Sequence, residues 1–398
     1  MSKNLRIAVV GGGLGGLATA RALSERGFRC DVFERAGILT EIGAGINVSP
    51  QATRALIALG LGEQAIARAN VSKGIFTRDM HTGEEIAYMD MRGAEEKYGA
   101  PFLTFHRADL IELLSASLDP ATIHLKHTLS GLEENGDEVV LRFANGVTHA
   151  ADIVIGADGV HSVVRQAIYG DQKPTYTGQM VWRAMVDGRD VPADLLDPSG
   201  HIRWVGPGRH FFGYYLRGRE VINIVTQEDT DEWVGESWNA AGDVDDMKAS
   251  FPDPEPRLAT LLAAVRDCSK WGLFTRPLTH DWGRGRIQLI GDAAHAMLPN
   301  AGQGACQAFE DAYILSRWLD AEADPVEAFE RFREVRIPRV HAVQTRAAAN
   351  ARMFHMKDAD ARNQQLKSAE VKGGAINWIY DFDPVKEWNR IPEPQSVG

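Results

Sequence analysis

A glycine cluster near the N-terminus limits the possible folds of this chain more than any other feature. Gly11, Gly13 and Gly16 follow a short apolar run at 5–10 and have the spacing G-x-G-x-x-G. In a βαβ unit this spacing forms a tight turn that brings backbone N–H groups against a pyrophosphate at the N-terminus of a helix. A helical segment follows at 17–23. A second short strand then leads to Glu34, about 20 residues beyond the turn, where an acid holds a ribose hydroxyl.

The coincidence of strand, turn, helix and acid predicts a dinucleotide site. Its expected residues are Gly11, Gly13, Leu14, Gly15, Gly16 and Glu34. Glycine-rich turns also join strands to helices for purely structural reasons, so the prediction depends on all four features together. The motif alone does not separate NAD from FAD.

Composition limits the partners and the compartment. The chain has 398 residues, a formal net charge of -11 and three cysteines, Cys30, Cys268 and Cys306, without C-x-x-C spacing. An acidic balance argues against nonspecific nucleic-acid binding, although local arginines can still line a cleft for a small anion. No disulfide framework, zinc site, signal segment or membrane span is expected, and we predict a cytoplasmic protein without a metal.

Apolar periodicity and turn residues predict the elements between the motifs. Hairpins are expected at 75–89 and 139–150, and a glycine-containing loop at 41–50. Helices are expected at 51–59, 107–118, 160–168 and 302–319. Residues 176–274 are rich in aromatic strand patterns, which indicates a separate sheet. Residues 325–354 predict one or two long amphipathic helices whose many arginines form a solvated face, and 378–383 predict a docked tail.

Two further motifs follow buried apolar strands. They are Gly156-Ala157-Asp158-Gly159-Val160-His161-Ser162 and Gly291-Asp292-Ala293-Ala294-His295. In this order, the three motifs resemble the single-component FAD-dependent aromatic hydroxylases, the group that includes salicylate hydroxylase and p-hydroxybenzoate hydroxylase. The resemblance covers nearly the whole chain and selects FAD over NAD as the tightly held cofactor.

The resemblance implies an α/β fold in three parts: a Rossmann-like FAD-binding domain, an inserted mixed β-sheet substrate domain, and C-terminal helices. The FAD-binding domain would comprise residues 1–74, 101–175 and 275–398, the last including the C-terminal helices. The substrate domain would comprise a hairpin at 75–100 and the sheet at 176–274.

The resemblance also implies cofactor contacts beyond the first turn. Asp292 would bind a ribityl hydroxyl, and the N-terminus of the helix near Gly302 would face the flavin pyrimidine. Arg35 and Arg107 match arginines that clamp the adenosine and pyrophosphate parts, although an ordinary surface charge is an equal alternative for Arg35. The remaining expected contacts are Asn47, Asp158, Gly159, Pro299, Gly304 and Ala305.

The expected catalytic pair is His210 and Tyr214, which match a His-x-x-x-Tyr pair in related hydroxylases. Positions four apart in a strand share a face, and a histidine near neutrality can accept a phenolic proton. The alternative is a core histidine and a core tyrosine. Asn47 stands where relatives similar to hydroxynicotinate monooxygenase have a histidine, and an amide takes no proton.

Other polar residues are weaker candidates. Arg183 and Arg203 could hold a substrate carboxylate, with ion pairing elsewhere as the alternative, which applies also to Arg217. Asn300 stands where related enzymes often carry a ring-facing histidine or tyrosine. Packing alone is a sufficient role for Cys306.

The implied reaction uses NADH or NADPH to reduce FAD, after which O2 forms a C4a-hydroperoxyflavin that hydroxylates a salicylate-like phenolic or hydroxylated heteroaromatic acid. One alternative is a flavin epoxidase or a hydroxylase of a non-phenolic secondary metabolite or quinone precursor, because residues 300–307 also resemble those enzymes. Another is a flavin-binding regulatory protein without turnover. The expected partners are a small aromatic substrate and O2, with no nucleic acid and no membrane, in a monomer or homodimer.

Overall fold

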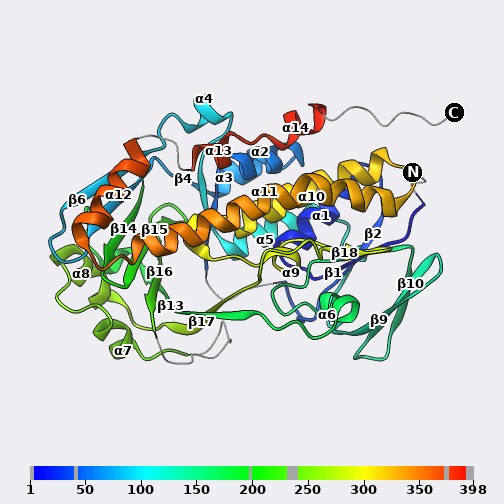
Figure 1. The fold of residues 1–398 in the computed structure, drawn as a ribbon, viewed down its shortest axis with the longest axis horizontal. Coiled ribbons are helices and arrows are strands. Elements are labelled where there is room, and N and C mark those ends of the chain that lie inside the picture. Colours follow the sequence, from blue (N-terminus) through cyan, green and yellow to red (C-terminus); the bar gives the residue numbers. More distant parts are fainter. Residues whose placement is uncertain (1–3, 40–43, 197–199, 231–240, 372–375, 391–398) are drawn as a thin grey trace.

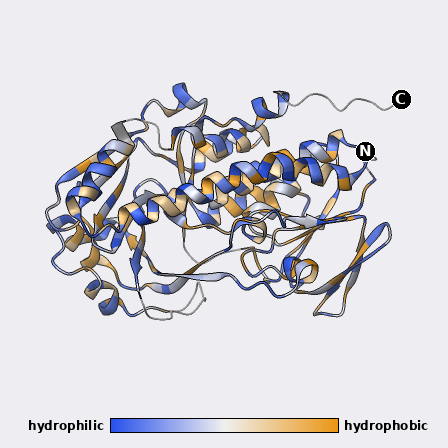
Figure 2. Ribbon diagram, in the orientation of Figure 1, coloured by the Kyte–Doolittle hydropathy of each residue, from blue (hydrophilic) through white to orange (hydrophobic). Residues whose placement is uncertain are grey.

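Two large sheets lie at opposite ends of the molecule, and the long helix α11 (Pro325–Phe354) runs from one to the other across the front of Figure 1. The computed structural model describes residues 4–39, 44–196, 200–230, 241–371 and 376–390. In Figure 2, α11 shows alternating hydrophobic and hydrophilic bands, as an amphipathic helix does. No helix among the described residues is long and apolar enough to cross a membrane.

The first sheet has six strands in the order β18-β19-β12-β1-β2-β8. Its strands are β1 (Ile7–Val10), β2 (Cys30–Phe33), β8 (Ile123–His124), β12 (Ile153–Gly156), β18 (Gly283–Arg284) and β19 (Ile287–Leu289). All neighbours are parallel except β18 and β19. The four residues of β1 are buried, which is typical of a parallel strand covered on both faces. The predicted α/β class with a parallel Rossmann-like sheet is confirmed.

The second sheet has seven strands in the order β17-β13-β16-β15-β14-β5-β6. They are β5 (Gly74–Asp79), β6 (Glu85–Asp90), β13 (Thr175–Asp187), β14 (Gly200–Gly206), β15 (Arg209–Leu216), β16 (Val221–Asp229) and β17 (Ser269–Thr275). β14 and β5 are parallel, whereas the other neighbours are antiparallel, so the predicted mixed sheet is confirmed. The expected hairpin at 75–89 is the β5–β6 pair.

One face of the seven-stranded sheet is apolar and covered by helices. Trp182, Trp204, Phe211 and Ile224 pack there against Met247 of α7 (Val244–Ala249) and Leu258 of α8 (Pro256–Ala264). Side chains at the alternate positions point to the opposite face. We call this opposite face, defined by His201, Arg203, His210, Phe212, Tyr214, Asn223, Val225 and Arg183, the inner face.

Two small sheets account for the other sheet strands of the described residues. One consists of β3 (Gly45–Val48), β7 (Leu103–His106) and β4 (Asn70–Val71), and the other of β9 (Leu129–Asn135), β10 (Glu138–Phe143) and β11 (Thr148–Ala151). The β10–β11 pair confirms the hairpin expected at 139–150. Of the expected loop at 41–50, residues 45–48 instead form β3, because they pair with β7, and 41–43 lie outside the described residues.

The remaining helices include one near each segment expected at 17–23, 51–59, 107–118, 160–168 and 302–319, together with several that were not expected. They are α1 (Leu14–Glu25), α2 (Pro50–Ala58), α3 (Gly62–Arg68), α4 (Ala94–Tyr98), α5 (Arg107–Ala116), α6 (Val163–Tyr169), α9 (Asp292–His295), α10 (Gly304–Ala321), α12 (Ala359–Val371), α13 (Asn377–Asp381) and α14 (Pro384–Arg390), with short 3-10 turns at 120–122, 188–190 and 299–301. α6 begins later than expected because Ser162 caps it by accepting a hydrogen bond from the backbone N–H of Arg165. The docked tail is confirmed, since Ile379 and Tyr380 of α13 are buried.

The solvated arginine face expected for 325–354 is wrong for two of its arginines. Arg336 is fully buried between α10 and α11, where it contacts Glu310 at 2.5 Å and Asp311 at 2.8 Å. Arg339 forms a second ion pair with Glu310 at 2.6 Å. The two acids belong to α10, so their charges compensate the buried guanidinium groups and attach α11 to the molecule.

Candidate active site

The glycine turn between β1 and α1 fits the close approach of a phosphate. A Cβ on Gly16 would clash with the carbonyl oxygen of Gly11, and a Cβ on Gly11 would clash with the carbonyl oxygen of Ala157. Gly11 also has φ +109, which L side chains rarely adopt. A Cβ on Gly13, the N-cap of α1, would meet nothing within 4 Å. The turn is therefore tight against the protein on one side and open at the helix N-terminus, as a pyrophosphate site requires.

The acid after β2 lies beside this turn. One Glu34 carboxylate oxygen accepts a hydrogen bond from the backbone N–H of Gly12 at 2.7 Å, and the other accepts from Ala36 at 2.8 Å. The neighbouring Arg35 is exposed. The Leu14 side chain belongs to the hydrophobic core, which leaves its backbone on the turn. Glu34 thus stands at the edge of the space left open by Gly13.

The three sequence motifs converge on this turn. Ideal Cβ positions on Gly15 of α1 and Gly291 lie 3.3 and 3.5 Å from the Cβ of Ala308 in α10. The carbonyl oxygen of Gly156 accepts the backbone N–H of Ile290 at 3.0 Å. Residues separated by nearly 300 positions therefore meet around one helix N-terminus.

The predicted residues of the second motif have distinct local roles. Asp158 caps α6, because its Oδ2 accepts the backbone N–H groups of Val163 at 2.7 Å and Val164 at 3.1 Å. Burial raises the pKa of Asp158, against the hydrogen bonds that it accepts. Its Oδ1 is buried without a hydrogen-bond partner among the described residues. Gly159 has φ +82 with open space where a Cβ would stand.

The segment that follows the third motif, at 299–305, lies beside β3. Gly302 has φ +63, and a Cβ there would lie 3.4 Å from Nδ2 of Asn47. Gly304 begins α10, and a Cβ on it would lie 3.9 Å from Oδ1 of Asp292. Pro299 and Asp292 are exposed, and Ala305 is partly buried against the core.

Arg107 lies at the start of α5. Its backbone N–H donates to the carbonyl oxygen of Ala44 at 2.8 Å, and its side chain is half-buried. It therefore lies next to the segment that enters β3.

Asp311 holds the third motif in position. Its Oδ2 accepts hydrogen bonds from the backbone N–H of Gly291 at 3.0 Å and from Nε2 of His295 at 2.7 Å, while Oδ1 accepts from Arg336. Sequence reasoning missed this acid. Its signal was an Asp at a position of α10 that faces the core, next to the equally buried Glu310.

The inner face of the seven-stranded sheet carries the expected catalytic pair. His210 and Tyr214 both lie on β15 and are buried, with Phe212 between them. Because they are four positions apart on a strand, their Cα atoms are about 13 Å apart. His210 packs against Phe354 at 5.4 Å between ring centroids, whereas Tyr214 lies beside Gly45, whose Cβ would be 2.5 Å from the tyrosine oxygen. His210 and Tyr214 therefore lie at opposite ends of the inner face. Burial raises the pKa of Tyr214 well above its usual value.

A row of side chains crosses the inner face between these ends. In register, Arg203 of β14 lies opposite Phe212 of β15, Phe212 opposite Val225 of β16, and Val225 opposite Arg183 of β13. The Arg203 guanidinium lies 4.3 Å from the ring centroid of Phe354 and 5.5 Å from that of Phe212. The Arg183 guanidinium lies 4.7 Å from the ring of Trp271. The two guanidinium groups thus flank an apolar surface formed by Phe212 and Val225, which we call the apolar floor.

His201 is a site residue that sequence reasoning missed. Its Nε2 donates to Oδ1 of Asn47 at 3.1 Å, and its Nδ1 is 2.8 Å from the hydroxyl oxygen of Ser72. Burial, together with the charge of Arg203, lowers the pKa of His201 to about 3, so the ring is neutral and orients Asn47. The available signal was the alternation along 201–205, which places His201 on the same face as Arg203.

Three weaker candidates are also placed. Arg217 forms an exposed ion pair with Asp109 of α5 at 2.5 Å, away from the inner face. Cys306 is fully buried, with its sulfur 3.2 Å from the hydroxyl of Ser49, so packing accounts for it. Asn300 is 9% exposed, and neither polar atom of its side chain has a hydrogen-bond partner among the described residues.

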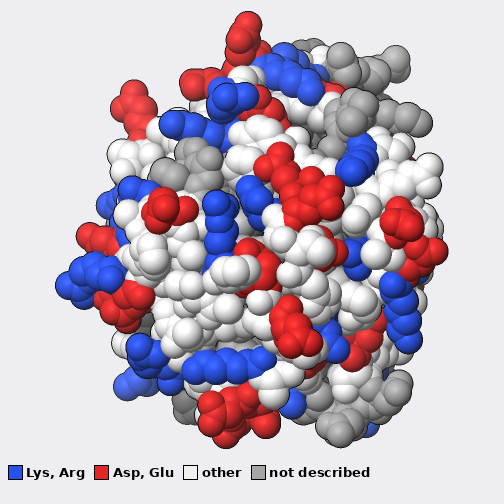
Figure 3. Space-filling view, turned by 90° about the vertical axis from the view of Figure 1, so that its left-hand side faces the viewer, with Lys and Arg blue, Asp and Glu red and all other residues white. Residues whose placement is uncertain are grey.

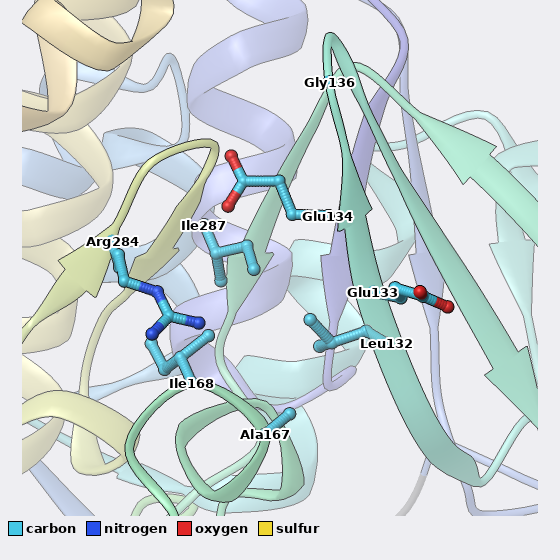
Figure 4. A pocket seen from close by; sticks show the side chains of 8 residues that line it. All are labelled: Leu132, Glu133, Glu134, Gly136, Ala167, Ile168, Arg284 and Ile287. Carbon is cyan, nitrogen blue, oxygen red and sulfur yellow. The ribbon is translucent and has the colours of Figure 1, made fainter.

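A surface groove lies at the other end of the molecule, between β9, α6 and β18 (Figure 4). It is lined by Leu132, Glu133, Glu134, Gly136, Ala167, Ile168, Arg284 and Ile287, and Glu133 points away from it. Glu134 accepts the backbone N–H of Arg286 at 3.0 Å, so one of its acids has a structural role. No group of three or more metal-binding side chains occurs in the described part of the chain.

The comparisons with known proteins agree with this geometry. A family model described as FAD binding domain matches residues 4–347. The chain is 35% identical over 383 residues to 3-amino-4-hydroxybenzoate 2-monooxygenase PtmB3 of Streptomyces platensis, covering 95% of this chain and 96% of that enzyme. It is 34% identical over 392 residues to 3-hydroxybenzoate 6-hydroxylase of Klebsiella oxytoca, covering 96% and 98%.

Solved structures share the whole architecture. A salicylate hydroxylase substrate complex superimposes with a TM-score of 0.83 at 26% identity, covering 99% of this chain and 100% of that one. A single-residue variant of Klebsiella pneumoniae HpxO complexed with FAD also gives a TM-score of 0.83, at 25% identity, with 95% and 99% covered. With the glycine turn, the three converging motifs and the second sheet, these matches show that the chain belongs to the FAD binding domain family and, within it, to the single-component FAD-dependent aromatic hydroxylases.

Proposed function

We propose that this enzyme hydroxylates a phenolic or hydroxylated heteroaromatic acid, with a salicylate-like compound as the working example. The observation that carries the proposal is the row Arg203, Phe212, Val225 and Arg183 on the inner face, with His210 and Tyr214 on the same strand as Phe212. An apolar floor suits a ring, and an arginine fork suits a carboxylate. Relatives named for hydroxybenzoates and for 6-hydroxynicotinate, such as the 6-hydroxynicotinate 3-monooxygenase of Bordetella bronchiseptica, support this substrate class.

FAD is the cofactor, and NAD(P)H is the co-substrate. When bound, FAD supplies the redox chemistry, which comprises acceptance of hydride and activation of oxygen. We propose that the pyrophosphate lies on Gly11, Gly13, Leu14, Gly15 and Gly16, and that Glu34, Arg35, Arg107, Asp158 and Gly159 hold the adenosine and phosphate parts. The flavin end would be held by Asn47, Asp292, Pro299, Gly302, Gly304 and Ala305. The tight but open glycine turn supports this assignment.

The residues of the inner face would divide the remaining work. Arg203 or Arg183 would hold the carboxylate, and the apolar floor would orient the ring and exclude water. His210 would accept the phenolic proton, which makes the ring richer in electrons, while Tyr214 would contact the substrate at the opposite end of the site. His201 would keep Asn47 oriented toward the cofactor side, since it donates to the amide oxygen.

Five finer statements belong to the same proposal. O2 is the oxidant, and the protein acts in the cytoplasm as a monomer or homodimer. Residues 75–100 and 176–274 form the substrate domain, and residues 1–74, 101–175 and 275–398 form the FAD-binding domain with the C-terminal helices. Nucleic acid is not a partner, and Figure 3 supports this by showing acidic and basic side chains interspersed over the visible face.

The test is NADH and NADPH oxidation by the FAD-loaded protein with a panel of hydroxybenzoates and hydroxypyridine carboxylates, recording O2 use and peroxide together. We expect at least one acid to stimulate oxidation with little peroxide, whereas the matched ring lacking the carboxylate does not. Stimulation accompanied by stoichiometric peroxide identifies a mimic that triggers reduction without being hydroxylated. Absence of stimulation by every phenolic acid contradicts the proposed substrate class.

A further inference from the structure

His210 is the first residue of a hydrogen-bonded chain of side chains, because one of its ring nitrogens contacts a second histidine. Nδ1 of His210 lies 2.8 Å from Nε2 of His355, the C-cap residue that follows α11. Nδ1 of His355 lies 2.7 Å from Oδ1 of Asp229, the last residue of β16. The exposed fraction of the side chain rises from 3% at His355 to 48% at Asp229. Three side chains thus connect the inner face to solvent.

The chemistry of the acid fixes the hydrogens along this chain. An ionised carboxylate only accepts, so the hydrogen between His355 and Asp229 belongs to Nδ1 of His355. A neutral His355 then accepts at Nε2, and His210 must donate from Nδ1. The Nε2 of His210 is left as a proton acceptor. Backbone contacts hold the chain in place, since the His355 carbonyl oxygen accepts the backbone N–H of Gly208 at 3.0 Å.

The hydrogen bonds and charges around the chain favour an ionised carboxylate at its outer end. Burial, with the charges of His355 and Arg203, lowers the pKa of His210 well below its usual value, so a proton taken up there is held weakly. Burial opposes ionisation of Asp229. However, hydrogen bonds from His355 and Gln179 and the charge of Lys357 lower its pKa. A protonated His355 would therefore stand beside a carboxylate that is already ionised.

We infer that His355 and Asp229 form a route that takes the substrate's phenolic proton from His210 to solvent. The substrate O–H bond breaks as an N–H bond forms at Nε2 of His210. The Nδ1–H of His210 then breaks as an N–H bond forms at Nε2 of His355. The resulting cation pairs with Asp229 and loses its proton to water through that carboxylate. This inference rests on the proposed function, in which His210 receives the proton.

The test compares two matched His-to-Gln substitutions, one within α11 and one at its C-cap. The amide of His355→Gln can still accept from His210 and donate to Asp229, but it does not carry a proton onward. His341→Gln is the control, because His341 lies on α11 and contacts the carbonyl oxygen of Thr279, at 3.1 Å, and the ring of His280, away from the route. Asp229→Asn removes the outer carboxylate. The probe is whichever of salicylate, 3-hydroxybenzoate and 6-hydroxynicotinate perturbs the flavin absorption of the wild-type holoenzyme.

Proton release on binding, followed by stopped flow with a pH indicator and no NAD(P)H present, is the main readout. We expect His355→Gln and Asp229→Asn to slow it about 100-fold while leaving the dissociation constant of the probe unchanged. His341→Gln should behave as the wild type. Equal release rates in His355→Gln and the wild type would overturn the route.

A second readout needs no substrate and separates this inference from the proposed function. In 15N NMR spectra of the holoenzyme, assigned with His210→Phe, we expect the hydrogen of His210 on Nδ1 and a bare Nε2. A hydrogen on Nε2 contradicts the route, whatever compound the enzyme hydroxylates. Failure of the proposed substrate class would instead be seen in the wild-type enzyme alone, as absence of ligand-stimulated NAD(P)H oxidation.

Discussion

At the scale of single residues, the glycines of the first turn differ in what a methyl group would meet. A Cβ on Gly16 clashes with backbone, whereas a Cβ on Gly13 meets nothing within 4 Å in the protein. Because the protein itself leaves room for a side chain at Gly13, a bound ligand is the reason that we infer for a glycine there. The two positions therefore separate folding from cofactor binding.

We expect Gly16→Ala to destabilise the apoprotein by roughly 1–3 kcal/mol, since backbone must move to relieve the clash. Gly13→Ala should leave the free energy of unfolding of the apoprotein within about 0.5 kcal/mol of wild type and weaken FAD binding. Urea unfolding and fluorescence titration with FAD measure both effects. Unchanged FAD affinity in Gly13→Ala would place the pyrophosphate elsewhere.

Asn300 offers a second residue-scale prediction, because its buried amide is unsatisfied within the described structure. Each such group costs about 1–3 kcal/mol, so Asn300→Leu should raise the stability of the apoprotein by about 1 kcal/mol. The same change should slow hydroxylation by the FAD-loaded enzyme if the amide serves a ligand. A less stable apoprotein would show that the amide already has partners.

At the scale of elements, α10 and α11 are joined by charges as well as by apolar packing. Burial raises the pKa of Glu310, but the charges of Arg339 and Arg336 outweigh it and hold the pKa below its usual value. Removing one partner of such a cluster leaves an uncompensated buried charge. The cluster also includes Asp311, so it supports the segment at 291–295.

We expect Arg336→Met to cost about 3–5 kcal/mol of stability, because two buried carboxylates lose the partner that they share. Arg331→Met is the matched control on the same helix. Arg331 is half-exposed and pairs with Glu327 and Glu334 at the surface, so its loss should cost less than about 1 kcal/mol. Urea unfolding of both variants decides the matter, and equal losses would remove the special role of the buried cluster.

The pH dependence of stability follows from Asp311. Burial alone would raise its pKa, but the charges of His295 and Arg336 and its hydrogen bonds lower it to about 2. The unfolded value is about 4, so this group stabilises the fold fully above about pH 4, and the contribution is lost as the pH falls toward 2. Asp311→Asn should therefore show a weaker loss of stability between pH 6 and pH 3 than the wild type. Parallel curves for both proteins would contradict the pKa shift.

Local patterns predicted elements better than they predicted partners. Strand, turn and helix periods identified β1, α1, the β5–β6 hairpin and the sheet of aromatic strands, because each period is a property of neighbouring residues. The contact between His201 and Asn47 joins positions 154 apart, and that between His210 and His355 joins positions 145 apart. Burial of Arg336 likewise depends on acids of another helix. Such contacts depend on how distant segments are arranged in the fold, and the periodicity of a local sequence carries no information about that arrangement.

At the scale of the whole molecule, the dinucleotide site is built from chain segments that are far apart in sequence. Gly11 contacts Ala157, and Gly15 and Gly291 both approach Ala308. A ligand that touches all of these segments stabilises their common arrangement. Binding of FAD and global stability are therefore coupled.

We expect the apoprotein to unfold at a lower temperature than the holoenzyme, with a gain of about 2.7 kcal/mol at an FAD concentration 100-fold above its dissociation constant. Riboflavin, which lacks the pyrophosphate and adenosine, should give a much smaller shift, and NAD should give none. Thermal unfolding across a ligand series measures this. A shift with NAD equal to that with FAD would contradict the assignment of the glycine turn.

The order of strands in the seven-stranded sheet determines which segments must be exchanged to transfer substrate specificity from one relative to another. β5 and β6 belong to this sheet at its edge, yet they lie nearly 100 residues before β13 in the chain, and β7 and β12 between them lie in other sheets. Any graft of the ring-binding surface therefore has to replace two separate stretches of gene, around 74–90 and 175–275, in one step. A chimera that carries only the longer stretch would pair β14 with a β5 strand of foreign origin, directly beside the row that holds Arg203.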